Sequence, residues 1–383
     1  MIYSGAGLRW RRMSNMAWVI CVLCFSVACH AKAELRVAFV NPDSPGNPFW
    51  DAVTHFMQAA ARSLNIQLQV HYGEKNRYLA TRRAIQAVRS ATRPDYLIFV
   101  YQAGQGPEVL KAAESAKVYS YIINTDIVDG EKALVGKPRE KYRYWLGHMS
   151  PDDIKAGKDL AEQLIAAARE KGRWAGDQRI RVVALSGSRD SSAALDRNKG
   201  LEQALAAHPD VELQQLLFNN WDPDLTRKQM PALLQRFPDT AVVWTASDGM
   251  ALGAAEGATS GAPLLIGGID WTNEGIVAVR DGNLVATVGG HFMEGGLALV
   301  LLNDHHRGID FAAEGVILRS RMQVIHQANV QAYWQALGDQ RWDKIDFRKL
   351  SKSANPDVKK YDFSLTAILN SVARKLPPSL ERR

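Results

Sequence analysis

LRVAFVNPDSPGNPFW, residues 35–50, contains the pattern on which the whole fold is built. The apolar run 35–40 is typical of a parallel strand that is buried on both faces. A polar loop follows, and Pro48 then opens a helix, as proline does at a first helical position. After residue 33, apolar runs and helix-like stretches alternate in this way about ten times. Such an alternation predicts an α/β protein with parallel sheets.

The alternation falls into two sets of similar size, separated near residue 150. This division predicts two lobes, each with a doubly wound parallel sheet, rather than one wide sheet. A last strand is predicted near residues 315–325. The tail from Asn329 onward carries Trp334, Trp342 and two further aromatic residues near 361–363. We therefore expect part of this tail to pack against the lobes.

The first 33 residues have the pattern of a secretory signal peptide. Three arginines between residues 9 and 12 precede an apolar stretch at 17–28, which is short for a membrane span. Ala31-Lys32-Ala33 fits the cleavage pattern, so the mature chain should begin at Glu34 in the periplasm. Two alternatives remain open, an uncleaved anchor and a lipoprotein attached at Cys29.

Composition narrows the classes of partner. All three cysteines lie within residues 1–33, so an exported mature chain of 350 residues (383 − 33) would hold its lobes together without disulfides. The same segment carries four basic residues and no acid, which leaves a net charge of +3 (7 − 4) on the mature part. We infer neither a nucleic-acid partner nor a membrane-surface partner from this charge.

Several motifs of cofactor and catalytic chemistry are missing from the sequence. The turn after the first strand, residues 41–46, lacks the glycine fingerprint of dinucleotide binding. There is no P-loop and no Gly-x-Ser-x-Gly nucleophile elbow. Asp304-His305-His306 could suggest a metal site, but adjacent helical histidines point to different faces. The sequence therefore predicts neither a cofactor nor a metal.

Polar side chains gather where the predicted strands end, which is where parallel sheets bind ligands. Amide, hydroxyl and carboxylate groups of this kind can bond several ligand hydroxyls at once. They are Asn47, Asn124, Ser247, Asp248 and Asp270. Asp248 precedes a helix, so helix capping is an alternative role for it.

Aromatic residues and one arginine accompany these polar groups. Phe49 and Trp50 follow the first strand, and Trp221 and Trp271 follow later ones. Their ring faces can stack on the C–H face of a sugar-like ring, although core packing is the commoner fate of a tryptophan. The planar fork of Arg197 could bind vicinal oxygens, or it could be a solvated helix residue.

Four stretches of this sequence resemble a known family. Residues 246–254, ASDGMALGA, follow its (N/S)D-x-x-ALGA pattern, and residues 47–50, NPFW, are similar to its entry into the first helix. Residues 95–99, DYLIF, with 123–125, INT, add to the likeness. The chain resembles the type I periplasmic binding proteins of the ribose/galactose branch, which includes the autoinducer-2 receptor, over roughly residues 34–330.

The resemblance implies two lobes joined by a three-crossover hinge. Residues 34–147 with 291–319 would form the N-terminal lobe, and residues 148–290 with 320–330 the C-terminal lobe. Residues 331–383 would be a C-terminal extension. The ligand-binding positions that the resemblance implies are Asn47, Phe49, Trp50, Asn124, Arg197, Trp221, Ser247 and Asp270, to which we add Asp248 and His291.

The chain departs from the family pattern at several of these places. Asn124-Thr125 stands where ribose proteins have an Asp-Arg pair, and Leu195 replaces a further arginine. Pro45 replaces a polar group of the autoinducer-2 receptor. His291 follows two glycines where family members place a glutamine or an arginine, so it could supply the missing contact. These departures count against both ribose and autoinducer-2 as the ligand.

The expected function is that of a monomeric periplasmic receptor for a small polyhydroxylated, sugar-like ligand. Closure of the lobes would signal to the permease of an ABC importer or to a membrane sensor kinase, and the long tail slightly favours a sensor. The alternative is an exported enzyme acting on a small glycoside or phosphate. It would have to use Asp248 and Asp270 as its carboxylate pair.

Overall fold

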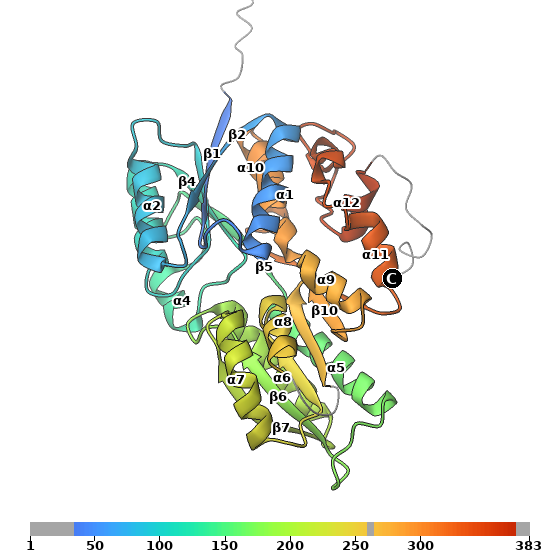
Figure 1. Ribbon diagram of the computed structural model, residues 1–383. Helices are drawn as coiled ribbons and strands as arrows, with labels where there is room; N and C mark the ends of the chain where they lie inside the picture. Colours follow the sequence, from blue (N-terminus) through green and yellow to red (C-terminus); the bar gives the residue numbers. More distant parts are fainter. Residues whose placement is uncertain (1–33, 259–263, 373–383) are drawn as a thin grey trace, which may run out of the picture. The chain divides into compact units, whose positions relative to one another are not determined.

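The computed structural model describes residues 34–258 and 264–372 (Figure 1). The predicted signal peptide lies outside these described residues. Within them, no helix combines the length and the apolar character needed to cross a bilayer.

The N-terminal lobe is built on a sheet of six parallel strands in the order β11-β5-β4-β3-β1-β2. These strands are β1 (Leu35–Asn41), β2 (Ile66–Tyr72), β3 (Tyr96–Phe99), β4 (Tyr119–Ile123), β5 (Trp145–Pro151) and β11 (Ile317–Ser320). The helices of this lobe are α1 (Pro48–Leu64), α2 (Arg77–Arg89), α3 (Gly106–Ala116), α4 (Asp129–Val135) and α10 (Glu294–His306).

The C-terminal lobe repeats the plan with a sheet in the order β12-β10-β9-β8-β6-β7, in which β12 alone is antiparallel to its neighbour. Its strands are β6 (Ile180–Ser186), β7 (Val211–Phe218), β8 (Val242–Thr245), β9 (Leu265–Asp270), β10 (Ala286–Gly289) and β12 (Gln323–His326). Its helices are α5 (Asp153–Glu170), α6 (Ser192–Ala207), α7 (Pro223–Arg236), α8 (Asp248–Gly257) and α9 (Asn273–Arg280).

Side-chain caps fix where the helices at the strand ends begin. Asn47 caps α1 by accepting a hydrogen bond from the Trp50 amide at 3.1 Å, and Pro48 occupies the first turn. Ser247 caps α8 by accepting from the Met250 amide at 3.3 Å. These caps end each loop at a defined residue, so the groups that follow the strands are held in place.

Three crossovers connect the lobes. The chain passes from β5 to α5, from β10 through the short helix η1 (His291–Met293) to α10, and from β11 to β12. The strand predicted near residues 315–325 is therefore two short strands, one in each sheet. Residues 148–151, which the sequence assigned to the C-terminal lobe, pair with β11 in the N-terminal sheet.

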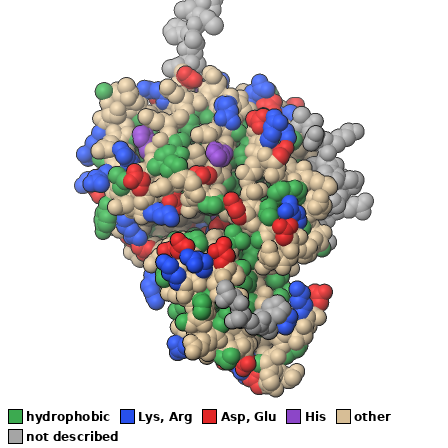
Figure 2. All heavy atoms as spheres, in the orientation of Figure 1, with side chains coloured by type: hydrophobic (Ala, Val, Ile, Leu, Met, Phe, Trp, Pro, Cys, Tyr) green, Lys and Arg blue, Asp and Glu red, His purple; other side chains and the backbone are tan. Residues whose placement is uncertain are grey.

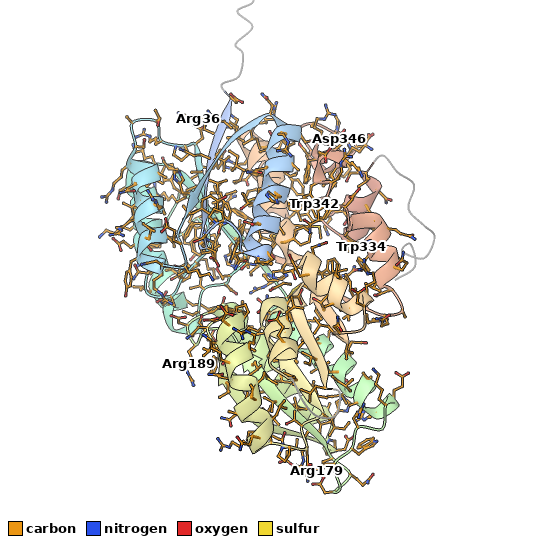
Figure 3. All side chains as sticks on the ribbon, viewed as in Figure 1. Arg36, Arg179, Arg189, Trp334, Trp342 and Asp346 are labelled. Atoms are coloured by element: carbon orange, nitrogen blue, oxygen red, sulfur yellow. The ribbon has the colours of Figure 1, made fainter. Side chains whose placement is uncertain are left out.

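The tail packs against the lobes after the third crossover. It contains α11 (Val330–Leu337), the short helices η3 (Trp342–Lys344) and η4 (Phe347–Leu350), and α12 (Leu365–Asn370). Trp342 is buried, whereas Trp334 on α11 is half-buried (Figure 3). The aromatic residues of the tail thus mark a packed segment, which we call the extension, residues 329–372.

Candidate ligand-binding site

Asn124 stands at the end of β4 with its side chain free to bind. Its backbone has a left-handed φ of +68°, and its amide N–H donates to Glu294 Oε2 at 2.8 Å. Its side-chain amide makes no hydrogen bond to another residue within 34–258 or 264–372. A carboxamide held in this way can both donate to and accept from a hydroxyl.

Phe49 and Trp50 form an aromatic pair at the start of α1. Their ring centroids are 5.1 Å apart at an interplanar angle of 77°. Phe49 also lies against the ring of His291, with centroids 4.7 Å apart. Asn47 beside them is engaged locally, because it caps α1 and donates to Asp43 Oδ2 at 2.9 Å.

Arg197, on α6, is the centre of a buried hydrogen-bonded array. Only 3% of the residue is exposed. Its Nε donates to Asp153 Oδ1 at 2.7 Å, and its Nη1 donates to the Ala246 carbonyl at 2.6 Å. Its Nη2 lies 3.2 Å from His291 Nε2. The guanidinium is therefore held in one orientation, as recognition by its planar fork requires.

Two glycines deliver Arg197 to this position by letting α5 and α6 approach closely. A Cβ on Gly157 would lie 2.0 Å from the Arg197 carbonyl oxygen, and one on Gly200 would lie 2.0 Å from the carbonyl oxygen of Ile154. Neither position admits a side chain unless the helices separate.

Asp270 ends β9 in a backbone conformation with φ of +148°, which side-chain-bearing residues rarely adopt. Its Oδ1 lies 3.5 Å from Arg197 Nη1 and 3.5 Å from His291 Nε2. Burial raises the pKa of Asp270 to about 7, although Arg197 opposes this rise. The strained turn thus points a carboxylate at the arginine.

His291 is neutral in this array. Burial, and secondarily the charge of Arg197, holds its pKa well below its ordinary value. Because Nε2 accepts from Arg197, the ring proton belongs on Nδ1. That Nδ1 atom is buried and has no hydrogen-bond partner among the described residues. His291 therefore keeps one donor that no residue of 34–258 or 264–372 uses.

The Trp221 ring lies over the arginine. The guanidinium carbon of Arg197 is 5.6 Å from its ring centroid, and its indole Nε1 donates to Ser188 Oγ at 3.3 Å. Gly187 leaves room for this ring, since a Cβ there would lie 2.1 Å from Trp221 Cζ2. Ser247, also near the strand ends, is 8% exposed and keeps its hydroxyl proton to donate.

The structure places Asp248 differently from the sequence prediction. The residue is fully buried, and its carboxylate accepts hydrogen bonds from the Thr272 amide, the Thr272 hydroxyl and Thr287 Oγ1, at 2.9, 3.1 and 2.6 Å. These hydrogen bonds hold the loop between β9 and α9. Ser247, and not Asp248, caps α8. Burial and the nearby Asp270 raise its pKa to about 7. Because Asp248 is fully buried, the two carboxylates of the enzymatic alternative do not both face a substrate.

Trp271 is a core residue rather than a ring of the site. It is 4% exposed and packs against Tyr333 of the extension, with centroids 4.8 Å apart. Asp304 and His305, which could have suggested a metal, are engaged elsewhere: Asp304 binds the extension, and His305 Nδ1 lies 2.8 Å from Tyr96 Oη. No group of metal-ligating side chains occurs among the described residues.

The lobes touch each other at the rim of the site. The Asp126 amide donates to Ser192 Oγ at 3.0 Å across the interface. Two exposed ion pairs accompany this contact, Lys199 with Asp129 and Arg77 with Asp190. Acidic and basic side chains are intermixed on the face drawn in Figure 2. Exposed pairs of this kind contribute little net free energy, so the rim can separate.

Sequence reasoning missed two carboxyl groups. Asp153 begins α5 and holds Arg197, and burial raises its pKa to about 6. Glu294 binds Asn124 and the Ser320 hydroxyl, and burial raises its pKa to about 8. Both residues lie just after a connection between the lobes. Their place after these predicted connections is the one sequence signal that could have identified them.

Comparison with known proteins gives the same architecture. The model of the periplasmic binding protein domain matches residues 37–308. The ribose import binding protein of Salmonella typhimurium is 27% identical over 285 residues, which cover 72% of this chain and 86% of that protein. A periplasmic sugar-binding protein from Pseudomonas fluorescens is 32% identical, with a TM-score of 0.77 over 87% of this chain and 99% of that one. A xylitol-binding protein of Mycolicibacterium smegmatis is 30% identical over 146 residues, 37% of this chain and 39% of that protein.

Proposed function

The chain belongs to the periplasmic binding protein family, and it is a receptor rather than an enzyme. From this premise we propose that it binds a neutral, polyhydroxylated ligand of the sugar or sugar-alcohol class. The observation that carries the proposal is the buried array of Arg197, Asp270 and His291 at the strand ends of one lobe, with the Phe49 ring of the other lobe lying against it. Fixed polar groups beside an aromatic face suit a ring that carries hydroxyls on its edge and C–H bonds on its face.

The charge balance of this array favours a neutral ligand. Arg197 is the buried cation, and the carboxylates of Asp153 and Asp270 already lie within ion-pair distance of it, at 2.7 and 3.5 Å. His291 adds no charge, because its pKa is depressed. A phosphate or carboxylate ligand would meet an arginine that is already neutralised, and burying an unpaired anion is costly.

The relatives support the class of ligand, and the sequence departures support a ligand other than ribose. Their names record binding of ribose, xylitol and galactofuranose. Asn124 offers an uncharged amide where ribose proteins carry an Asp-Arg pair, and His291 offers a single N–H. We propose that both contact the ligand, together with Phe49, Trp50 and Trp221, and that Asn47 and Ser247 shape the site through their caps.

The output of binding would be the closed arrangement of the lobes, recognised by the permease of an ABC importer. The relatives named as import proteins favour an importer over a sensor kinase. We further propose that residues 1–33 direct export and are removed, and that the mature protein acts as a monomer. Mass spectrometry of the exported protein, with Glu34 expected as its first residue, and sedimentation velocity test these two points.

Titration calorimetry of residues 34–383 against neutral pentoses, hexoses and polyols, with sugar phosphates alongside, tests the ligand class. We expect saturable binding of a neutral compound that is lost in Asp270→Asn and weakened in Trp221→Ala. Trp174→Ala is the matched control, because that tryptophan is 39% exposed on a distant loop of the same lobe. Preference for a phosphorylated sugar, or silence across all neutral compounds, would contradict the proposal.

A further inference from the structure

The extension makes the chain cross between the lobes a fourth time. α11 follows β12 and packs on the C-terminal lobe, and from Trp342 onward the chain packs on the N-terminal lobe. Residues 338–341 make the passage. The matched family domain ends at residue 308, so this crossing lies outside it. We propose that the extension is a fourth connection that limits how far the lobes open and braces the loop carrying Asp270.

On the C-terminal lobe, the extension contacts the loop directly behind the ligand site. The buried ring of Tyr333 meets the Trp271 ring at 64°, and the Tyr333 hydroxyl donates to Gln323 at the third crossover. The Arg280 guanidinium carbon lies 4.8 Å from the centroid of the Trp334 ring. Since Trp271 is the chain neighbour of Asp270, this contact holds the residue that follows the strained turn.

On the N-terminal lobe, the extension is anchored by a buried aromatic cluster. Phe56 of α1 meets the rings of Trp342 and Phe347 at centroid distances of 5.5 and 5.2 Å. Phe347 is fully buried. Contacts this large and apolar hold the segment firmly, so it moves with the lobe.

A buried carboxylate adds a polar anchor next to this cluster. Asp304 of α10 accepts hydrogen bonds from the Ser351 hydroxyl at 2.5 Å, the Lys352 amide at 2.7 Å and the Tyr361 hydroxyl at 2.9 Å. The Ser353 amide and hydroxyl donate to the same carboxylate, at 3.1 and 2.5 Å, so the buried charge is satisfied almost entirely by the extension. The extension is therefore fixed to both lobes and not to one alone.

The segment between the two anchors is too short to follow a wide opening. Residues 338–341, even fully extended, span only about 14 Å. In the structure they are not extended, since Gln340 has a left-handed φ of +46° and a Cβ on Gly338 would lie 2.5 Å from the Trp334 carbonyl oxygen. Opening of the lobes can first straighten this bent segment. Beyond its extended length, the lobes must stop separating, or the extension must detach from one of them.

A lengthened linker tests the inference, which rests on the proposed opening and closing of the lobes. We would insert about ten Gly/Ser residues between Asp339 and Gln340, which makes that segment a flexible coil. Spin labels at Glu108→Cys on α3 and Glu202→Cys on α6 report the distance between the lobes by double electron–electron resonance. Residues 34–383 contain no other cysteine to interfere. The same insertion after Gly176, in an exposed loop of one lobe, is the control.

We expect the ligand-free protein with the long linker to show a broader distribution that extends to longer distances. The parent protein and the Gly176 control should share one narrower distribution. Coincident distributions in all three proteins would overturn the inference. Because the comparison is made without ligand, its outcome does not depend on whether a sugar is found to bind.

Discussion

Replacing Arg197 by methionine tests the buried array most directly. The substitution keeps an unbranched apolar stem but removes the cation from a residue that is 3% exposed. It deletes hydrogen bonds of 2.7 Å to Asp153 and 2.6 Å to the Ala246 carbonyl, and it leaves Asp270 without its cation. Breaking a buried pair by removing one partner costs roughly 3–5 kcal/mol, because the remaining charge is uncompensated.

The loss in Arg197→Met should depend on pH with a definite sign. Asp153 and Asp270 have pKa values raised to about 6 and about 7 while the arginine is present, and they should rise further without it. The folded variant then takes up protons between about pH 8 and pH 5.5, where the unfolded chain still holds both groups ionised. The free energy of unfolding of the variant therefore rises as the pH falls. The difference in this free energy between parent and variant should shrink accordingly.

Urea unfolding followed by circular dichroism at about pH 8 and about pH 5.5 measures both quantities. Lys158→Met, an exposed position on α5, removes the same charge and should stay within about 0.5 kcal/mol of the parent. The reasoning is refuted if Arg197→Met loses less than about 1 kcal/mol at the higher pH. It is also refuted if the deficit is the same at both pH values.

Three further predictions concern the surroundings of the array. The pKa of Glu294 is raised from 4.5 to about 8, so its contribution to the free energy of unfolding falls as the pH rises from about 4.5 to about 8. Glu294→Gln should therefore flatten the pH dependence of stability measured by urea unfolding. Gly187→Ala should push the Trp221 ring aside and weaken binding of the sugar or polyol found by calorimetry roughly tenfold. An unchanged affinity would show that Trp221 does not contact the ligand. Thr287→Val should lower the free energy of unfolding by about 2 kcal/mol, because it removes a 2.6 Å hydrogen bond to the buried Asp248 carboxylate, whereas Thr287→Ser should not.

Patterns that act locally along the chain predicted most of the fold. The alternation of apolar runs and helices predicted two parallel-sheet lobes, and this prediction is confirmed. The region 315–325 was misread as one strand, because the polar residues at 319–321 do not reveal that the chain changes sheets there. β11 pairs with β5 in one sheet, and β12 pairs with β10 in the other, which only the folded chain shows.

The site was predictable only where a residue's role follows from its place at a strand end. Asn124 and Asp270 do stand there. The role of Asp248 depends on Thr287, which is 39 positions away and reaches it only in the folded chain. Asp153 was missed for the same reason, since its partner Arg197 is 44 positions distant. That the other nine residues predicted for the site bind a ligand stays a prediction.

The close approach of α5 and α6 at Gly157 and Gly200 has a consequence for how such a receptor can diversify. The place of Arg197 is set by backbone packing between two helices and not by the ligand. The proposed ligand contacts, such as Asn124 and His291, can therefore be exchanged while the central guanidinium keeps its orientation. A receptor of this design can acquire a new ligand by a few substitutions at these contacts, and a library for redesigning it should leave the two glycines untouched.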